Sequence, residues 1–227
     1  MKNLEILNHK KSIIFIDIDE TIFKTYAKIY VRKKGEIIKK LSNTEFNNYQ
    51  LKEGESFDFK EFRDGKLFKE TSKPINANIK YIKKIIDIIK RKENDSKIIF
   101  LTAREDFLDK QKFLDKFREQ GFEIDNKNLM YIERAGNLKQ KTIAENKKKC
   151  IKKYLEKGKY NFVKIIDDDE KNIKILKEIA KEIPQTFLKE LEKEHKPQKD
   201  EPLLIFQGYL AKHTGKIELI FQEEIYN

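Results

Sequence analysis

The chain has 227 residues, of which 38% are hydrophobic, and its 50 basic and 39 acidic residues give a net charge of +11. This length suits one domain with an insertion, or at most two small domains, and no apolar stretch approaches the roughly 20 residues that a membrane span requires. The N-terminal MKNLEILNHKK has no long apolar segment with a cleavage site, and the single Cys150 can form no internal disulfide, so we expect a cytoplasmic protein.

The positive net charge has two explanations. It could serve the binding of nucleic acid or another polyanion. The chain is also rich in Lys, Ile and Asn, and Lys far outnumbers Arg, as an AT-rich coding sequence would produce. Charge alone therefore leaves a nucleic-acid partner open.

The first half of the chain predicts a strand followed by an insertion. Residues 12–18 contain four consecutive apolar residues, 13–16, a run that is typical of a buried strand. Segments 25–31 and 36–41 flank KKGE and predict a β-hairpin with Gly35 in its turn. The stretch 42–74 has no sustained period, because its aromatic residues are scattered among charges.

The second half predicts strands that alternate with helices. Such alternation implies βαβ units and a parallel sheet. A helix and a linker then lead to a terminal β-hairpin. The predicted strands are 97–101, 129–132 and 161–167, the helices are 76–92, 105–120 (ending at Gly121), 142–157 (ending near Gly158) and 170–182, the helix and linker occupy 183–202, and the hairpin strands are 203–211 and 216–222.

Polar side chains follow three of the predicted strands. Asp17, Asp19 and Thr21 follow the first, Thr102 and Arg104 follow KIIFL, and an acidic run, Asp167 to Asp169, follows NFVKII. Ligands of open α/β sheets bind beyond the carboxyl ends of the strands, so we expect these groups to converge. Paired carboxylates favour a hard cation such as Mg²⁺, and a carboxylate can also serve as a nucleophile or as a general acid and base.

These three segments resemble the motifs of the haloacid dehalogenase superfamily of phosphatases. Asp17-Ile-Asp19-Glu20-Thr21 matches its DxDx[TV] motif, Thr102 in IIFLTAR matches its Ser or Thr after an apolar strand, and IIDDDEKN matches its acidic pair. The resemblance covers about residues 10–182. The segment DIDETIFKTYAKIYVRK also resembles small proteins of this superfamily that bacteriophages carry.

The resemblance implies a single domain with a three-layer, Rossmann-like α/β core around a parallel sheet. The core would comprise 10–22 and 75–182. A flap and a small cap would be inserted after the first strand, at 23–74, and the C-terminal β-hairpin would belong to an appendix at 183–227.

The resemblance also implies roles for individual residues. Asp17 would be the nucleophile and a Mg²⁺ ligand, and Asp19 would be the general acid and base and bind the metal through its backbone carbonyl. Thr102 would donate a hydrogen bond to the phosphoryl oxygens, Thr21 would contribute to substrate binding, and Asp168 would be a metal ligand.

Neighbouring residues receive supporting roles. Asn172 would support Asp168, and Asp167 could be an outer acid that does not bind the metal itself. Glu20 replaces a frequent Gly and is expected to face solvent at the mouth of the site. Arg104 stands at a strand end, where its guanidinium could bind phosphate through two hydrogen bonds; an ordinary surface arginine is the alternative.

The superfamily also has a lysine before its last motif, and this chain offers several. The pattern of Thr, a Lys five residues later and an apolar helix face favours Lys147, and one lysine of the group can face the pocket on a helix. The candidates are Lys139, Lys141, Lys147, Lys148 and Lys149.

Other chemistry-bearing patterns are weaker. AGNLKQKT resembles a phosphate-binding loop but lacks both required glycines. The three histidines have no zinc-ligand spacing. Cys150 lies in a predicted helix, where a packing role is the default.

The sequence thus predicts a Mg²⁺-dependent phosphomonoesterase that acts on a phosphorylated small molecule or nucleotide. One alternative is a polynucleotide end phosphatase, for example for 3′-phosphates, because a small cap leaves the site open and the flap carries a basic and aromatic mix that could contact bases. Another is a catalytically idle protein that binds phosphate or nucleic acid. The flap residues concerned are Tyr26, Tyr30, Arg32, Lys33 and Lys34.

Overall fold

The computed structural model describes residues 10–92, 94–138 and 142–226. Its centre is a six-stranded sheet in the order β11-β10-β9-β1-β7-β8, in which every neighbouring pair is parallel except β10 and β11. The predicted α/β class with a mostly parallel sheet is therefore confirmed. The strands are β1 (Ser12–Ile16), β7 (Lys97–Thr102), β8 (Met130–Arg134), β9 (Phe162–Asp167), β10 (Leu204–Ala211) and β11 (Ile217–Ile225).

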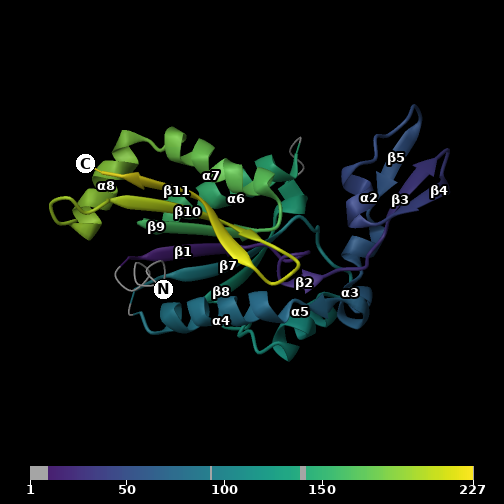
Figure 1. The fold of residues 1–227 in the computed structure, drawn as a ribbon, viewed down its shortest axis with the longest axis horizontal. Helices are drawn as coiled ribbons and strands as arrows, with labels where there is room; N and C mark the ends of the chain where they lie inside the picture. Colours follow the sequence, from purple (N-terminus) through teal and green to yellow (C-terminus); the bar gives the residue numbers. More distant parts are fainter. Residues whose placement is uncertain (1–9, 93, 139–141, 227) are drawn as a thin grey trace.

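Helices cover both faces of this sheet (Figure 1). One face carries α4 (Asn76–Lys90) and α5 (Lys110–Glu119), and the other carries α6 (Ile143–Gly158), α7 (Glu170–Glu182) and α8 (Gln185–His195). Successive residues of a strand point to opposite faces, so Ile14 and Ile16 enter one apolar core and Ile13 and Phe15 enter the other. The unbroken apolar run of β1 follows from burial on both sides.

The helix predicted over 105–120 is shorter than expected. It begins at Lys110, and residues 103–109 form a loop. Tertiary contacts hold this loop: Asp106 forms an ion pair with Arg134, and the ring of Phe107 stacks on Phe113 at 4.0 Å. Helix propensity is a weak preference that such contacts override.

The segment 23–74, called the cap from here on, is more ordered than its sequence indicates. β3 (Ile29–Lys33) and β4 (Glu36–Leu41) form the predicted hairpin, with positive φ at Lys34 and Gly35 as a two-residue turn between twisted strands requires. β5 (Glu55–Asp58) adds a third strand beside β3. The cap also contains α2 (Asn43–Asn47), the 3₁₀ turn η2 (Lys60–Arg63), α3 (Gly65–Thr71) and the short pair β2 (Phe23–Lys24) and β6 (Lys73–Pro74).

The base of the cap is attached to α5 by specific contacts. The Asp109 carboxylate accepts hydrogen bonds from the backbone N–H groups of Gly65 and Lys66, at 2.7 and 2.8 Å. A Cβ at position 65 would lie 2.6 Å from the Asp109 carbonyl oxygen, so only glycine fits there. The rings of Phe68 and Phe113 pack below at 4.7 Å. These contacts fix α3 against the core.

The C-terminal hairpin extends the central sheet. β10 pairs in parallel with β9, and β11 pairs with β10 in the antiparallel direction. The hairpin thus pairs along an edge of the sheet within this chain. No helix among the described residues combines the length and the apolar character that crossing a membrane requires.

Candidate active site

The candidate site lies where the strand order reverses. From β1 the chain adds β7 and β8 on one side, and β9 then returns to the other side of β1. Such a switch point forms a crevice at the carboxyl ends of the strands. Asp17 follows β1 and donates its backbone N–H to the Ile166 carbonyl at 2.9 Å, while Asp167 ends β9. Backbone pairing therefore brings the two carboxylates together.

Lys147 connects these two carboxylates. Its Nζ lies 2.6 Å from Asp17 Oδ1 and 2.6 Å from Asp167 Oδ2, and its side chain is buried. The helix that carries it begins with a capping box formed by Thr142 and Glu145. Lys147 shares the inward face of α6 with the buried Ile151, one turn further on.

The other predicted lysines lie elsewhere or outside the described residues. Lys148 pairs with Glu178 and Glu182 on α7, and Lys149 is exposed. Among the candidates that the structure describes, Lys147 alone reaches the carboxylates. Lys139 and Lys141 fall in the segment that is not described.

Burial makes the carboxylates of this site hard to ionise. It raises the pKa of Asp17 well above its usual value, against the lowering effect of Lys147. It also raises the pKa of Asp168 to about 7, with a further contribution from the charge of Asp167. For Lys147 burial lowers the pKa, but the two carboxylates it contacts more than offset this, so the net shift is upward.

This charge balance fits a divalent cation. Carboxylate oxygens of Asp17, Asp167 and Asp168 lie within 4.8 Å of one another, and among the described residues the ammonium of Lys147 alone contacts the first two. An oxygen-rich, buried cluster with surplus negative charge is the donor set that Mg²⁺ takes. Thr21 adds a hydroxyl 3.5 Å from Asp168 Oδ1.

The cluster of carboxylates contains one residue beyond the predicted ligands. Asp167, expected to act from outside the set, stands inside it; the predicted contact of Asp19 with the metal is through its backbone carbonyl and stays a prediction. Asn172 also has another partner than predicted, because its Nδ2 donates to Asp167 Oδ1 at 3.0 Å and not to Asp168. The third of three consecutive aspartates, Asp169, caps α7.

Asp19 is held by Arg104. The guanidinium Nη2 lies 2.6 Å from Asp19 Oδ1 and Nε lies 2.9 Å from Oδ2, while Nη1 donates to the Phe62 carbonyl of the cap at 2.9 Å. The guanidinium also lies over the ring of Phe68 at 4.8 Å. In this structure Arg104 is buried and contacts protein groups, so its predicted contact with substrate stays a prediction.

Thr102 lies at the end of β7 and is fully buried. Its Oγ1 accepts a hydrogen bond from the backbone N–H of Arg104 at 3.1 Å. This contact turns the chain at the strand end and sets the direction in which Arg104 leaves it. Its predicted hydrogen bond to a phosphoryl oxygen is not tested by the structure.

The expectation that Glu20 faces solvent was wrong. Its side chain is 16% exposed and binds groups from two other parts of the chain. Oε1 accepts from the Thr25 N–H at 3.0 Å and from Asn43 Nδ2 at 3.4 Å, and Oε2 lies 3.3 Å from His213 Nδ1. Asn43 and His213 come from segments distant in sequence, so a local pattern could not indicate them.

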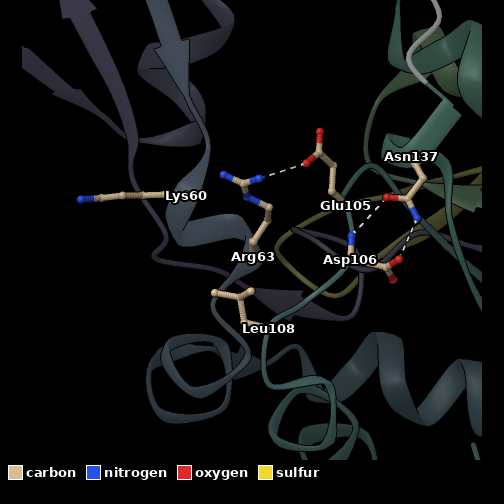
Figure 2. Close-up of a pocket in the computed structure, with 6 residues that line it drawn as sticks. All are labelled: Lys60, Arg63, Glu105, Asp106, Leu108 and Asn137. Atoms are coloured by element: carbon tan, nitrogen blue, oxygen red, sulfur yellow. Dashed lines mark hydrogen bonds and ion pairs between the residues drawn. The ribbon is translucent and has the colours of Figure 1, made fainter. Parts of the chain in front are cut away.

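A cleft of about 600 Å³ opens between the cap and the core (Figure 2). Arg63 and Glu105 approach each other across it at 3.5 Å, and Asn137 exchanges hydrogen bonds with Asp106. The cleft lies beside the contact of Arg104 with Asp19 and Phe62. On one wall Glu105 follows Arg104 in the sequence, and on the other Arg63 follows Phe62. The cleft is lined by Lys60, Arg63, Glu105, Asp106, Leu108 and Asn137.

Comparison with family models, curated proteins and solved structures finds no match to this chain. The interpretation of the site therefore depends on its own geometry and charges.

Two features of the site have a signal in the sequence. One is the acidic run after β9, and the other is the Thr142–Glu145 capping box that sets the inward face of α6. The Glu20 contacts and the cleft had no such signal.

Proposed function

We propose that this chain is a Mg²⁺-dependent phosphomonoesterase with a core of the haloacid dehalogenase type. The observation that carries the proposal is the buried Asp17 carboxylate at the switch point of the sheet, with Lys147 at 2.6 Å and Asp168 beside it. A carboxylate placed beside an ammonium, a hydroxyl and a cluster of carboxylate oxygens that suits a metal ion is arranged to attack an electrophile that carries negative charge.

The reaction would proceed in two displacements. Asp17 attacks phosphorus, the bond from phosphorus to the leaving oxygen breaks, and Asp19 supplies a proton to that oxygen. Water then attacks the phosphorus of the aspartyl phosphate and loses its proton to Asp19; the bond from phosphorus to Asp17 breaks, which releases phosphate and restores the Asp17 carboxylate and the protonated Asp19. Lys147 orients Asp17 and, with Thr102, would balance charge on the phosphoryl oxygens.

Asp17, Asp168 and the backbone carbonyl of Asp19 would hold the Mg²⁺. The ion would supply positive charge that the site's single lysine cannot, which offsets the repulsion between the carboxylates and an incoming phosphate. Asp167 would remain with its partners Lys147 and Asn172.

The cleft between cap and core is the proposed place for the rest of the substrate. Four of the charges at its walls are paired locally, Arg63 with Glu105 and Asp106 with Arg134, and the Nζ of Lys60 lies over the Tyr30 ring, 4.8 Å from its centroid. A neutral group that forms hydrogen bonds, such as a nucleoside or a sugar, suits this wall better than a second phosphate. Leu108, which is almost fully exposed, offers apolar surface to such a group.

A polynucleotide end phosphatase is the second candidate, and one surface favours it. The cap hairpin exposes four lysines that could contact a phosphate backbone. The idle binding protein is disfavoured by the presence of Asp19, which binding of phosphate alone would not need. The four lysines are Lys33, Lys34, Lys39 and Lys40.

The test is a screen for phosphate release with Mg²⁺ over sugar phosphates, nucleotides and phosphorylated oligonucleotides. Asp17→Asn should remove turnover and keep the fold, because an amide is not a nucleophile. Asp169→Asn is the matched control, since Asn also caps helices well and the residue lies outside the cluster. Equal activity of Asp17→Asn and the wild type would contradict the mechanism, and phosphate binding without turnover by the wild type would favour the idle receptor.

A further inference from the structure

Glu20 adopts a backbone conformation that is unusual for its residue type. Its φ is +59°, in the left-handed region that glycine enters freely and other L-residues enter at an energetic cost. The residue directly follows Asp19 in the catalytic loop. A strained conformation persists when surrounding contacts hold it, and such positions cluster at functional sites.

The contacts that hold Glu20 come from two other parts of the fold. From the cap, Thr25 donates its backbone N–H at 3.0 Å and its hydroxyl at 3.3 Å, and Asn43 donates its amide at 3.4 Å. From the tip of the C-terminal hairpin, His213 Nδ1 lies 3.3 Å from the second carboxylate oxygen. One side chain thus joins the catalytic loop, the cap and the hairpin.

The hairpin tip is seated at this place by independent contacts. The buried Asn78 donates Nδ2 to the carbonyl of Thr21 at 2.8 Å and to that of Lys212 at 3.4 Å. A Cβ at Gly215 would lie 2.5 Å from Ala77 Cβ, so the turn lies directly on the start of α4. The position of His213 beside the catalytic loop therefore follows from the seating of the whole turn.

We infer that Glu20 is a positioning residue that fixes the peptide between Asp19 and Glu20, and that the C-terminal hairpin, through His213, is part of the active site. This inference rests on the proposed function for its catalytic part. Arg104 holds the side chain of Asp19, and the N–H of the peptide that follows donates to the Phe23 carbonyl at 2.8 Å, in the same loop that the Glu20 side chain ties to Thr25 of the cap. The carbonyl of that peptide is the proposed backbone ligand of the metal, so its direction matters to the site.

The decisive variant is Glu20→Gly. Glycine takes φ +59° without steric cost, so the melting temperature should stay the same or rise while the side-chain tether is lost. We expect kcat on a small aryl phosphate to fall at least fivefold with less than a twofold change in KM. For His213→Ala we expect kcat to fall about twofold. His213→Asn should recover the wild-type kcat, because its amide nitrogen can occupy the place of Nδ1. Thr214→Ala, on the same exposed turn, is the control.

A second measurement does not depend on turnover. Amide hydrogen exchange of the metal-free protein should show faster exchange at Thr25 in Glu20→Gly, and wild-type exchange in Thr214→Ala. Unchanged exchange at Thr25 would overturn the tether, and faster exchange with unchanged kcat would overturn the positioning role. An inactive wild type would refute the proposed function, whereas exchange at Thr25 would still decide whether Glu20 holds the cap.

Discussion

Arg104 and Asp19 form a two-point ion pair at the boundary between core and cap, with Nη2 at 2.6 Å from Oδ1 and Nε at 2.9 Å from Oδ2. The third nitrogen of the guanidinium donates to the cap carbonyl of Phe62. The side chain proposed as the general acid is thus oriented by a group that also contacts the cap.

Loss of Asp19 should affect substrates according to their leaving groups. Asp19→Asn is expected to lower turnover of alkyl phosphates roughly 10²–10⁴-fold, the usual contribution of a general acid or base. The loss should be smaller for nitrophenyl phosphate, whose leaving group needs little protonation. Rates across a series of aryl and alkyl phosphates measure this, and an equal loss throughout would exclude Asp19 as the acid.

Arg104→Lys should reproduce part of that effect. Lysine keeps the charge but cannot form the planar two-point contact, so we expect at least a tenfold loss of kcat on alkyl phosphates. Arg118→Lys, on α5, where the half-buried Arg118 forms a two-point pair with Asp125, is the matched control and should have wild-type kcat. Wild-type turnover by Arg104→Lys would show that the orientation of Asp19 does not depend on the two-point ion pair.

Mg²⁺ should stabilise the fold more at pH 8 than at pH 5. The folded-state pKa of Asp168, about 7, lies above its ordinary value of 3.8, so without metal this group's contribution to stability falls as pH rises from about 4 to about 7. Above that range the ionised carboxylates bind metal without competition from protons. Melting temperatures with and without Mg²⁺ test this, with Asp168→Asn as a variant that should respond less. A larger metal effect at pH 5 would contradict the site.

Lys164→Met should stabilise the protein at low pH. Lys164 on β9 is fully buried, its Nζ has no hydrogen-bond partner among the described residues and lies 4.4 Å from the Tyr209 ring centroid. Burial lowers its pKa to about 7. The unfolded chain then binds more protons between about pH 7 and 10.5, so the destabilising effect of Lys164 is complete below pH 7 and disappears towards pH 10.5.

Urea unfolding at several pH values measures this effect. The gain in Lys164→Met should be roughly 5 kcal/mol at pH 6, as the pKa difference implies, and near zero at pH 10.5. Lys177→Met, at an exposed position of α7, should show no such trend. If the gain in the free energy of unfolding of Lys164→Met is independent of pH, its cause is better packing and not removal of a buried charge.

Salt dependence should separate the two enzyme candidates. If the substrate is a nucleic-acid end, each backbone phosphate contacted by a lysine contributes about −0.7 to the slope of log affinity against log salt for single strands. Lys33 and Lys34 are exposed, whereas Arg32 is already paired with Asp58. Lys33→Ser with Lys34→Asn, which tolerates the positive φ at 34, should flatten the slope by roughly 1.4.

The control for this experiment is an equal loss of charge outside the cap. Lys149→Ser with Lys157→Ser removes two exposed charges from α6 and should leave the slope as in the wild type. A slope near zero for the wild-type protein would end the nucleic-acid interpretation.

The core could be predicted because its signals are local. Four consecutive apolar residues in β1 and regular alternation of strands and helices required a parallel sheet, and sheet geometry then brought Asp17 and Asp167 together. The inward direction of Lys147 followed from helix period once the start of α6 was known. These inferences need no knowledge of distant contacts.

The cap and the rim of the site could not be predicted in the same way. The start of α5 depends on contacts of the preceding loop with Arg134 and with Phe113, and β5 forms because β3 lies beside it. Glu20 was misjudged because its partners, Asn43 and His213, are 23 and 193 positions away. Polar contacts between distant segments leave no period in a sequence.

The central position of β1 in the sheet has a consequence for folding during synthesis on the ribosome. Ile16 pairs with Ile166, 150 residues later. At synthesis rates of about 5–20 residues per second, roughly 8 to 30 seconds pass between the synthesis of β1 and the synthesis of β9. During this time it can pair with β7 alone, and one of its edges stays open. β1, which leads directly to Asp17, is therefore a segment of the nascent chain that needs shielding from other chains.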